Sequence, residues 1–322
     1  MTVPALFRGT LRLPAIAAPM FLVSGPALVT ATCQAGVAGT FPALNARTSE
    51  QLAGWLTEID AALAAARAAD PAAPVAPYGI NLILHPSNPR LAPDLALVGR
   101  RRVPFVIASL GHPGAVVEAV HAYGGLVFSD VIHADHARKA IAAGVDGIVA
   151  VASGAGGHAG AQSAFSLVRE IREFWDGALI LGGAIADGYA VRAAEVLGAD
   201  FAYLGTRFIA TRESSAPEAY KQMLVDATAK DIVYTDAVSG VNANFLWPSL
   251  EKAGYRREDL AQGVGPGQIK PLAEEARAWR ELWSAGHGVA TIHDVPAVRA
   301  LCDRLATEYR AACAAPASPA LA

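Results

Sequence analysis

A glycine-rich stretch that contains one histidine is the part of this sequence best suited to chemistry. The apolar run 145–151 has the pattern of a buried strand, and it opens into four glycines within residues 154–160. Glycine backbone can approach a flat ligand closely because no Cβ intervenes. His158 is the only titratable side chain in this stretch, and an imidazole exchanges protons near neutral pH. The pattern predicts an active-site turn, and the alternative is a tight turn with a surface histidine.

Two further glycine turns follow later apolar segments. Gly182 and Gly183 follow the segment that ends at Leu181, and Gly205 and Thr206 follow the segment that ends at Leu204. Free backbone N–H groups at such turns can bind an anion, and barrels of parallel strands often bind phosphate after their last two strands. Either turn alone is ordinary, but the two together favour a phosphate site.

The elements that position these turns alternate between strands and helices. Apolar segments with strand character cover residues 14–20, 36–40, 78–82, 103–107, 126–128, 147–149, 178–181 and 201–204. Helical patterns lie at 26–35, 49–69, 113–123, 134–143, 166–174, 188–197 and 295–313. Eight alternations predict an α/β fold, a (β/α)₈ TIM barrel. A doubly wound open sheet competes, but no Gly-x-Gly-x-x-Gly follows the first strand.

The pattern changes after Thr206, which predicts a second, smaller unit. We expect residues 1–212 and 287–322 to form the barrel, and residues 213–286 to form a mainly helical insertion that covers the barrel mouth. Within the insertion, residues 231–246 have a mixed pattern, and 239–246 look like a loop on physical grounds alone. Gly265-Pro266-Gly267 predicts a turn.

Composition excludes several classes of function. The net charge of the 322 residues is −3 with acids and bases mixed, so we expect no nucleic-acid partner and no polybasic membrane anchor. No apolar run is long enough to span a membrane, and no signal peptide is apparent. Three widely spaced cysteines argue against a disulfide framework, and neither they nor the histidines and carboxylates show metal-ligand spacing. We therefore expect a cytoplasmic protein without a metal site.

Four short motifs together resemble one enzyme family. They are Ala17-Ala18-Pro19-Met20, Gly156-Gly157-His158-Ala159-Gly160, Gly182-Gly183-Ala184-Ile185-Ala186-Asp187-Gly188 and Gly205-Thr206-Arg207-Phe208. This set is similar to that of the FMN-dependent nitronate monooxygenases, formerly called 2-nitropropane dioxygenases, over about residues 13–289. Flavin-dependent NADH:quinone reductases share most of the motifs, and FMN-type enoyl-acyl-carrier reductases share the Gly-Gly-His-x-Gly element.

The resemblance implies FMN at the C-terminal mouth of the barrel. Ala18, Pro19 and Met20 would lie at the cofactor, with Met20 beside the flavin ring, and Asn81 would hydrogen-bond the ring edge. Ser153 and Gly157 would line the ring and ribityl chain, and Gly182, Gly183, Gly205 and Thr206 would hold the phosphate. His158 would be the general base that removes the proton next to a nitro group. The implied reaction oxidises a nitronate or nitroalkane with oxygen to a carbonyl compound and nitrite, and the resemblance is compatible with a homodimer.

Two alternatives stay open at this point. One is an NADH:quinone oxidoreductase on the same scaffold. In those enzymes a proline-bearing loop, here His85–Pro89, is linked to access of the nicotinamide. The other is a flavin-binding protein whose catalysis has decayed, motivated by two departures from the family. Asp130 stands where many members have lysine, and we expect it to point away from the flavin because a carboxylate would repel the reduced ring. His287 replaces a usual glutamine, and we expect it to reach the flavin pocket.

Overall fold

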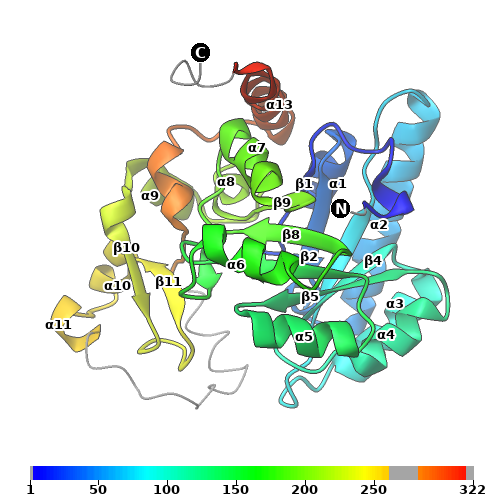
Figure 1. The fold of residues 1–322 in the computed structure, drawn as a ribbon, viewed down its shortest axis with the longest axis horizontal. Helices are drawn as coiled ribbons and strands as arrows, with labels where there is room; N and C mark the ends of the chain where they lie inside the picture. Colours follow the sequence, from blue (N-terminus) through cyan, green and yellow to red (C-terminus); the bar gives the residue numbers. More distant parts are fainter. Residues whose placement is uncertain (1–2, 261–281, 317–322) are drawn as a thin grey trace.

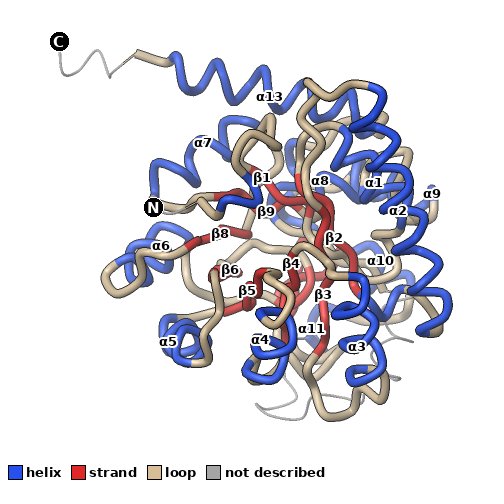
Figure 2. Tube along the Cα trace, turned by 90° about the vertical axis from the view of Figure 1, so that its right-hand side faces the viewer, coloured by secondary structure: helices blue, strands red, loops and turns tan. Residues whose placement is uncertain are grey.

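A closed barrel of eight parallel strands forms the body of the molecule (Figures 1 and 2). The computed structural model describes residues 3–260 and 282–316. In spatial order the barrel strands are β1 (Ala15–Ala17), β2 (Ala38–Pro42), β3 (Tyr78–Ile83), β4 (Phe105–Ser109), β5 (Leu126–Val131), β6 (Gly147–Val151), β8 (Ala178–Gly182) and β9 (Phe201–Leu204). β9 pairs back onto β1 in parallel, which closes the barrel and confirms the predicted (β/α)₈ architecture.

Helices surround the strands, as Figure 2 shows from the side. They are α1 (Pro26–Gln34), α2 (Ser49–Ala69), α3 (Leu91–Arg101), α4 (Gly114–His121), α5 (Ala134–Ala142), α6 (Ala164–Arg172), α7 (Gly188–Leu197), α8 (Thr206–Ile209) and the returning α13 (Val298–Ala314). Local capping sets several of their ends. The Thr48 side chain accepts a hydrogen bond from the Gln51 N–H at the start of α2, and Gly198 ends α7 with a φ of 116°.

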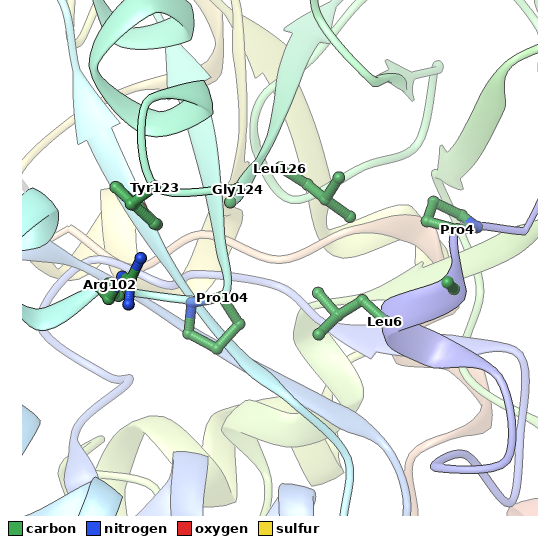
Figure 3. A pocket seen from close by; sticks show the side chains of 9 residues that line it. Pro4, Leu6, Arg102, Pro104, Tyr123, Gly124 and Leu126 are labelled. Atoms are coloured by element: carbon green, nitrogen blue, oxygen red, sulfur yellow. The ribbon is translucent and has the colours of Figure 1, made fainter.

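Aromatic residues close the amino-terminal end of the barrel. Phe7, in the short 3₁₀ turn Ala5–Phe7, packs against Phe105, Phe128 and Phe201, with ring centroids 4.9 to 6.1 Å apart. Outside this plug lies a small pocket of about 290 Å³, which Figure 3 shows between the N-terminal turn and the α4–β5 connection. Because this end is filled by side chains, the space available to a large ligand lies at the other end.

The predicted insertion contains a sheet as well as helices. Its described part comprises α9 (Glu218–Asp226), the 3₁₀ turn Ala229–Asp231, β10 (Ile232–Thr235), β11 (Ala243–Leu246), α10 (Trp247–Lys252) and α11 (Arg257–Leu260). β10 and β11 pair antiparallel and lie side by side in Figure 1. β11 also pairs with β7 (Gly157–His158). The expectation of a loop at 239–246 is therefore wrong for residues 243–246, because pairing with a strand some 85 positions away leaves no local pattern. The Gly265-Pro266-Gly267 turn lies outside the described residues.

Two further 3₁₀ turns, Ala43–Asn45 and His287–Thr291, complete the described elements. Over residues 3–260 and 282–316, no helix is long and apolar enough to cross a bilayer. The same ranges hold no cluster of three or more histidine, cysteine or acidic side chains that could bind a metal ion.

Candidate functional site

A cavity of about 1170 Å³ opens at the carboxyl ends of the barrel strands. Each strand contributes a residue at or just beyond its end: Ala18, Pro42, Asn81, Ser109, Asp130, Val151, Gly182 and Gly205. Residues of the insertion and of the 284–288 segment complete the lining. Barrels of this kind carry their chemistry at this face, because the loops that follow the strands converge there.

The structure brings together all but one of the residues predicted for the site. Those that line the cavity are Ala18, Pro19, Met20, Asn81, Gly157, His158, Gly182, Gly183, Gly205 and Thr206. Ser153 is not among the lining residues: it is exposed, and its backbone N–H donates to the Gln162 carbonyl at 2.8 Å. The neighbouring Gly154 lines the cavity in its place.

The imidazole of His158 is positioned by the insertion rather than by the barrel alone. The sequence places His158 on a turn beyond a strand, whereas in the structure it lies in β7, opposite Ala243 of β11. The Asn244 side-chain amide donates to the Ala155 carbonyl at 2.6 Å, and the Tyr234 hydroxyl donates to the Ala159 carbonyl at 3.0 Å. Both residues were missed by sequence reasoning, which had only their position in the mixed stretch as a signal.

One wall of the cavity, here called the glycine wall, consists of residues 154–158, 182–183 and 205–206. At Gly183 the φ of 138° excludes most side chains, and an added Cβ would lie 2.9 Å from the Ser153 carbonyl oxygen. At Gly205 an added Cβ would meet nothing nearer than the Ala18 Cβ at 3.7 Å. Packing within the protein therefore does not require glycine at 205, and a methyl group there would occupy space on the cavity side.

Thr206 retains a donor on this wall. Its Oγ1 accepts a hydrogen bond from the Gly286 N–H at 2.9 Å, so the hydroxyl proton is left for another partner. The N-terminus of α7 is used differently, because the Asp187 carboxylate accepts from the Ala190 N–H and Glu308 accepts from the Gly188 N–H. A phosphate would therefore be bound by the two glycine turns and not by the start of α7.

The segment that returns from the insertion lies against the glycine wall. The His287 N–H donates to the Gly154 carbonyl at 2.9 Å, and Gly286 and Gly288 line the cavity. The His287 side chain is exposed and is not part of the lining, so the expectation that it reaches the pocket is wrong for this structure. The His287 ring nevertheless packs next to the glycine wall, since an added Cβ at Gly154 would lie 3.2 Å from it.

Side chains build a second surface of the cavity, here called the polar floor, from Asn81, Ser109, Asp130 and Tyr203. The Asn81 amide donates to the Ile107 carbonyl at 3.1 Å and to Ser109 Oγ at 2.7 Å. The Ser109 hydroxyl donates in turn to Asp130 Oδ2. Since both amide hydrogens of Asn81 are used inside the protein, only its oxygen can serve a ligand.

Asp130 belongs to this floor, which corrects the expectation that it points away from the cavity. Burial raises the pKa of its carboxyl to about 6, and the hydrogen bond from Ser109 opposes that rise. A carboxyl that is about half protonated near pH 6 repels an anion less than a full carboxylate would. Ser109 and Tyr203 gave no signal in the sequence, because their roles depend on strand register.

Three of the four non-glycine residues with positive φ in the described part of the chain lie at or next to the same cavity. Leu22, Leu110 and Ala184 have φ values of 61°, 59° and 55°, and the last two line the cavity. The fourth, Arg102, has a φ of 50° and lines the small pocket at the other end of the barrel. The Leu22 N–H donates to the Asn45 side chain at 2.9 Å, and the Asn45 amide donates to the Met20 carbonyl at 2.9 Å. Such outliers persist where the surroundings over-determine them, typically at ligand sites.

The loop after β3 also reaches the cavity. Asn88 and Pro89 line it, while the His85 ring lies 2.7 Å from the Ser87 hydroxyl and is not part of the lining. The loop therefore borders the cavity through its proline rather than through its histidine.

Comparisons with known proteins agree with this geometry. The family described as nitronate monooxygenase matches residues 9–308. The nitronate monooxygenase of Paraburkholderia phytofirmans is 31% identical over 326 residues, covering 88% of this chain and 89% of that protein. The enzyme of the same name from Neurospora crassa is 30% identical over 312 residues, covering 84% and 79%. The structure of FabK from Thermotoga maritima has a TM-score of 0.79 at 24% identity, covering 97% of both chains, and this likeness concerns the fold.

The family match spans the barrel, the described insertion and most of the returning helix α13, so it includes both surfaces of the cavity. Two relatives at 30% identity or above carry the family's name over most of their length. On these grounds the chain belongs to the nitronate monooxygenase family of oxidoreductases.

Proposed function

We propose that this protein uses FMN to oxidise alkyl nitronates, or nitroalkanes, with molecular oxygen, giving a carbonyl compound and nitrite. The observation that carries the proposal is the position of His158 beside the glycine wall, in one cavity large enough for a cofactor and a substrate. Family membership supports the reaction class.

The residues of the glycine wall fit the phosphate end of FMN. Gly182, Gly183, Gly205 and Thr206 lie on one side of the cavity and offer backbone and one hydroxyl donor to an anion. The room beside Gly205, which packing inside the protein does not explain, is the kind of space that a bound group fills. Ala18, Pro19, Met20 and Gly157 would lie along the rest of the cofactor, and the Asn81 oxygen would accept a hydrogen bond from it.

When bound, FMN supplies the redox chemistry, and the protein supplies binding, orientation and proton transfer. The His158 imidazole, held by β11, would accept the proton from the carbon next to the nitro group of a nitroalkane. If the substrate arrives already as a nitronate, that proton is absent and His158 serves only to orient the anion. Apolar side chains such as Met20, Ile83 and Val151 line the same cavity and restrict water.

Anaerobic mixing tests this proposal. The purified protein, loaded with FMN, is mixed with the nitronate of 2-nitropropane, and the flavin absorbance is followed. Rapid bleaching by the nitronate, with nitrite formed once oxygen is admitted, is the expected result. Failure of the protein to retain FMN, or bleaching by NADH alone, would contradict the proposal as the main activity.

A second candidate, an FMN-dependent NADH:quinone oxidoreductase, is favoured by one observation. Pro89 lines the cavity from the loop after β3. In the NADH:quinone reductases that share these motifs, a proline-bearing loop at this position is linked to access of the nicotinamide. The same mixing experiment separates the two candidates, because this second activity requires fast reduction by NADH and no response to the nitronate.

A further inference from the structure

Two polar atoms of the floor are buried without a hydrogen-bond partner in the part of the chain that the structure describes. They are Asp130 Oδ1 on β5 and the Tyr203 hydroxyl oxygen on β9. Both residues line the cavity, and the charge of Asp130 contributes to raising the pKa of Tyr203, so the two side chains are electrostatic neighbours. Buried polar groups are normally paired, and an unpaired one needs an explanation.

The hydrogen bonds of the floor determine where Asp130 can carry a proton. Asn81 donates to Ser109, so the Ser109 hydroxyl proton points toward Asp130 Oδ2. A proton bound to the carboxyl would therefore reside on Oδ1, the unpaired atom. An ionised carboxylate with one bare oxygen in a buried site is costly, whereas the neutral acid costs much less. Burial accordingly raises the pKa of Asp130 to about 6.

Asp130 is also the only carboxylate among the described residues that line the cavity. Cations and histidines on the same lining are Arg47, Arg90, His112, His136, Lys139 and His158. Arg90 is paired with Asp94 at 2.8 Å. Of the two strands that adjoin β5, β4 presents Ser109, and the residue paired with Asp130 on β6 is the apolar Val149. The more distant strand β9 presents Tyr203. Tyr220 and Tyr234 also border the cavity, and burial raises the pKa of each.

We propose that Asp130 is a proton-binding residue of the cavity floor, which takes up a proton at Oδ1 when negative charge gathers above it. The charge would be that of the reduced flavin ring or of a nitronate, so the inference rests on the proposed function. The proton comes from solvent and returns there when the charge leaves. No bond between heavy atoms changes, and Asp130 transfers no electrons. The residue thereby links the affinity of the cavity for anions to pH.

The reduction potential of bound FMN measures this link directly. If Asp130 binds a proton when FMN is reduced, each pH unit above about 6 makes reduction of the bound FMN ten times less favourable, in addition to the pH dependence of the flavin itself. For a two-electron couple, that factor corresponds to about 30 mV per pH unit. We expect this extra slope in the natural protein between about pH 6 and 8 and its loss in Asp130→Asn. Asp135→Asn is the matched control, because Asp135 is exposed on α5 and does not line the cavity.

The histidines also gain charge at low pH, so the slope of the natural protein alone does not test the idea. An equal slope in Asp130→Asn would overturn the proposal, and a slope lost only in that variant supports it. The Asp135→Asn protein must keep the natural slope, since otherwise the effect is a general one of surface charge.

Infrared spectroscopy of the protein without flavin supplies a test that survives failure of the FMN proposal. A protonated carboxyl has its own C=O stretch, which should be present at pH 5 and disappear as the pH rises through about 6. The band should be absent in Asp130→Asn and retained in Asp135→Asn. In Ser109→Ala it should persist to higher pH, because the lost hydrogen bond favours the ionised form. Absence of the band at pH 5 in the natural protein would overturn the inference, whatever the fate of FMN binding.

Discussion

The glycine wall and the polar floor face one cavity but are built from different parts of the chain. The wall consists of backbone from the turns after β6, β8 and β9, and His158 is its one titratable side chain. The floor consists of side chains from β3, β4, β5 and β9, and the first three are joined by hydrogen bonds. The wall therefore depends on backbone conformation and on the lack of Cβ atoms, whereas the floor depends on strand register and on protonation.

Replacement of the wall's one titratable side chain is expected to have the largest effect on turnover. In His158→Asn, oxidation of a neutral nitroalkane should fall by about 10²- to 10⁴-fold, the usual contribution of a general base. Oxidation of the preformed nitronate should fall much less, because no proton is removed from carbon. Steady-state rates with both forms of 2-nitropropane measure the difference.

FMN retention by His158→Asn is the control for this prediction, since the backbone of the wall is unchanged. Equal losses on both substrate forms would show that His158 acts in binding and not as a base. No loss on either form would favour a decayed catalyst.

The stability contributed by the floor should depend on pH through Asp130. The carboxyl of Asp130 has a folded-state pKa raised from 3.8 to about 6, so the folded state binds more protons than the unfolded state between these values. Its contribution to stability is therefore lost as the pH rises from about 4 to 6. Asp130→Asn removes that dependence and should be the more stable protein at pH 7, by up to about 3 kcal/mol at 1.36 kcal/mol per pKa unit.

Urea unfolding of the two proteins at pH 4, 5 and 7 measures this difference. The advantage of the variant should be near zero at pH 4 and constant above pH 6. A variant that is less stable at every pH would mean that the folded state favours the carboxylate. That result would contradict the raised pKa assigned to Asp130.

The contrast explains which features of the site the sequence reveals. The glycines of the wall can be recognised in the sequence by residue type: the backbone conformation favours glycine at Gly183, the Tyr203 ring crowds Gly182, and at Gly205 the space lies on the cavity side. The floor is invisible, because Ser109 and Asp130 become partners only through the parallel register of β4 and β5, which are 21 residues apart along the chain. The barrel itself is predictable, since each strand is a continuous apolar run and each helix a periodic one.

The error at His287 has a related cause. Its family position suggests the pocket, but in the structure only its backbone N–H contacts the wall, at the Gly154 carbonyl, while the residue is exposed and does not line the cavity. The pairing of β7 with β11 could not be predicted from the sequence either, since a strand of two residues shows no periodicity.

Two alanine substitutions on the glycine wall should separate the effect of backbone conformation on stability from the effect of cavity space on FMN binding. Gly183→Ala places a Cβ at a φ of 138° and against the Ser153 carbonyl, which should cost about 1 to 3 kcal/mol of stability. Gly205→Ala meets no protein atom within 3.7 Å, so the fold should be unaffected. Its methyl group would instead reduce FMN affinity, by about tenfold if the phosphate end shifts at a cost near 1.4 kcal/mol.

Thermal unfolding without flavin and fluorescence titration with FMN provide the two measurements. Each variant is the other's control, because the chemical change is the same methyl group. If Gly205→Ala loses stability but binds FMN normally, the space beside Gly205 has no role in ligand binding and the phosphate end lies elsewhere.

The smallest expected effect lies where the insertion supports the wall. Asn244 donates to the Ala155 carbonyl at 2.6 Å, and its removal leaves that oxygen short of a partner at the turn before His158. We expect Asn244→Ala to cost about 1 kcal/mol of stability, because one hydrogen bond is lost. Nitroalkane turnover should fall by less than tenfold, because β11 still pairs with β7 through the backbone. Asn242→Ala is the matched control, since exposed Asn242 also lines the cavity but its side chain makes no hydrogen bond within residues 3–260 and 282–316. Loss of the same size in both variants would mean that the hairpin acts by covering the cavity and not by holding the turn. A loss confined to Asn244→Ala, and larger for the nitroalkane than for the nitronate, would tie the insertion to the placement of the imidazole.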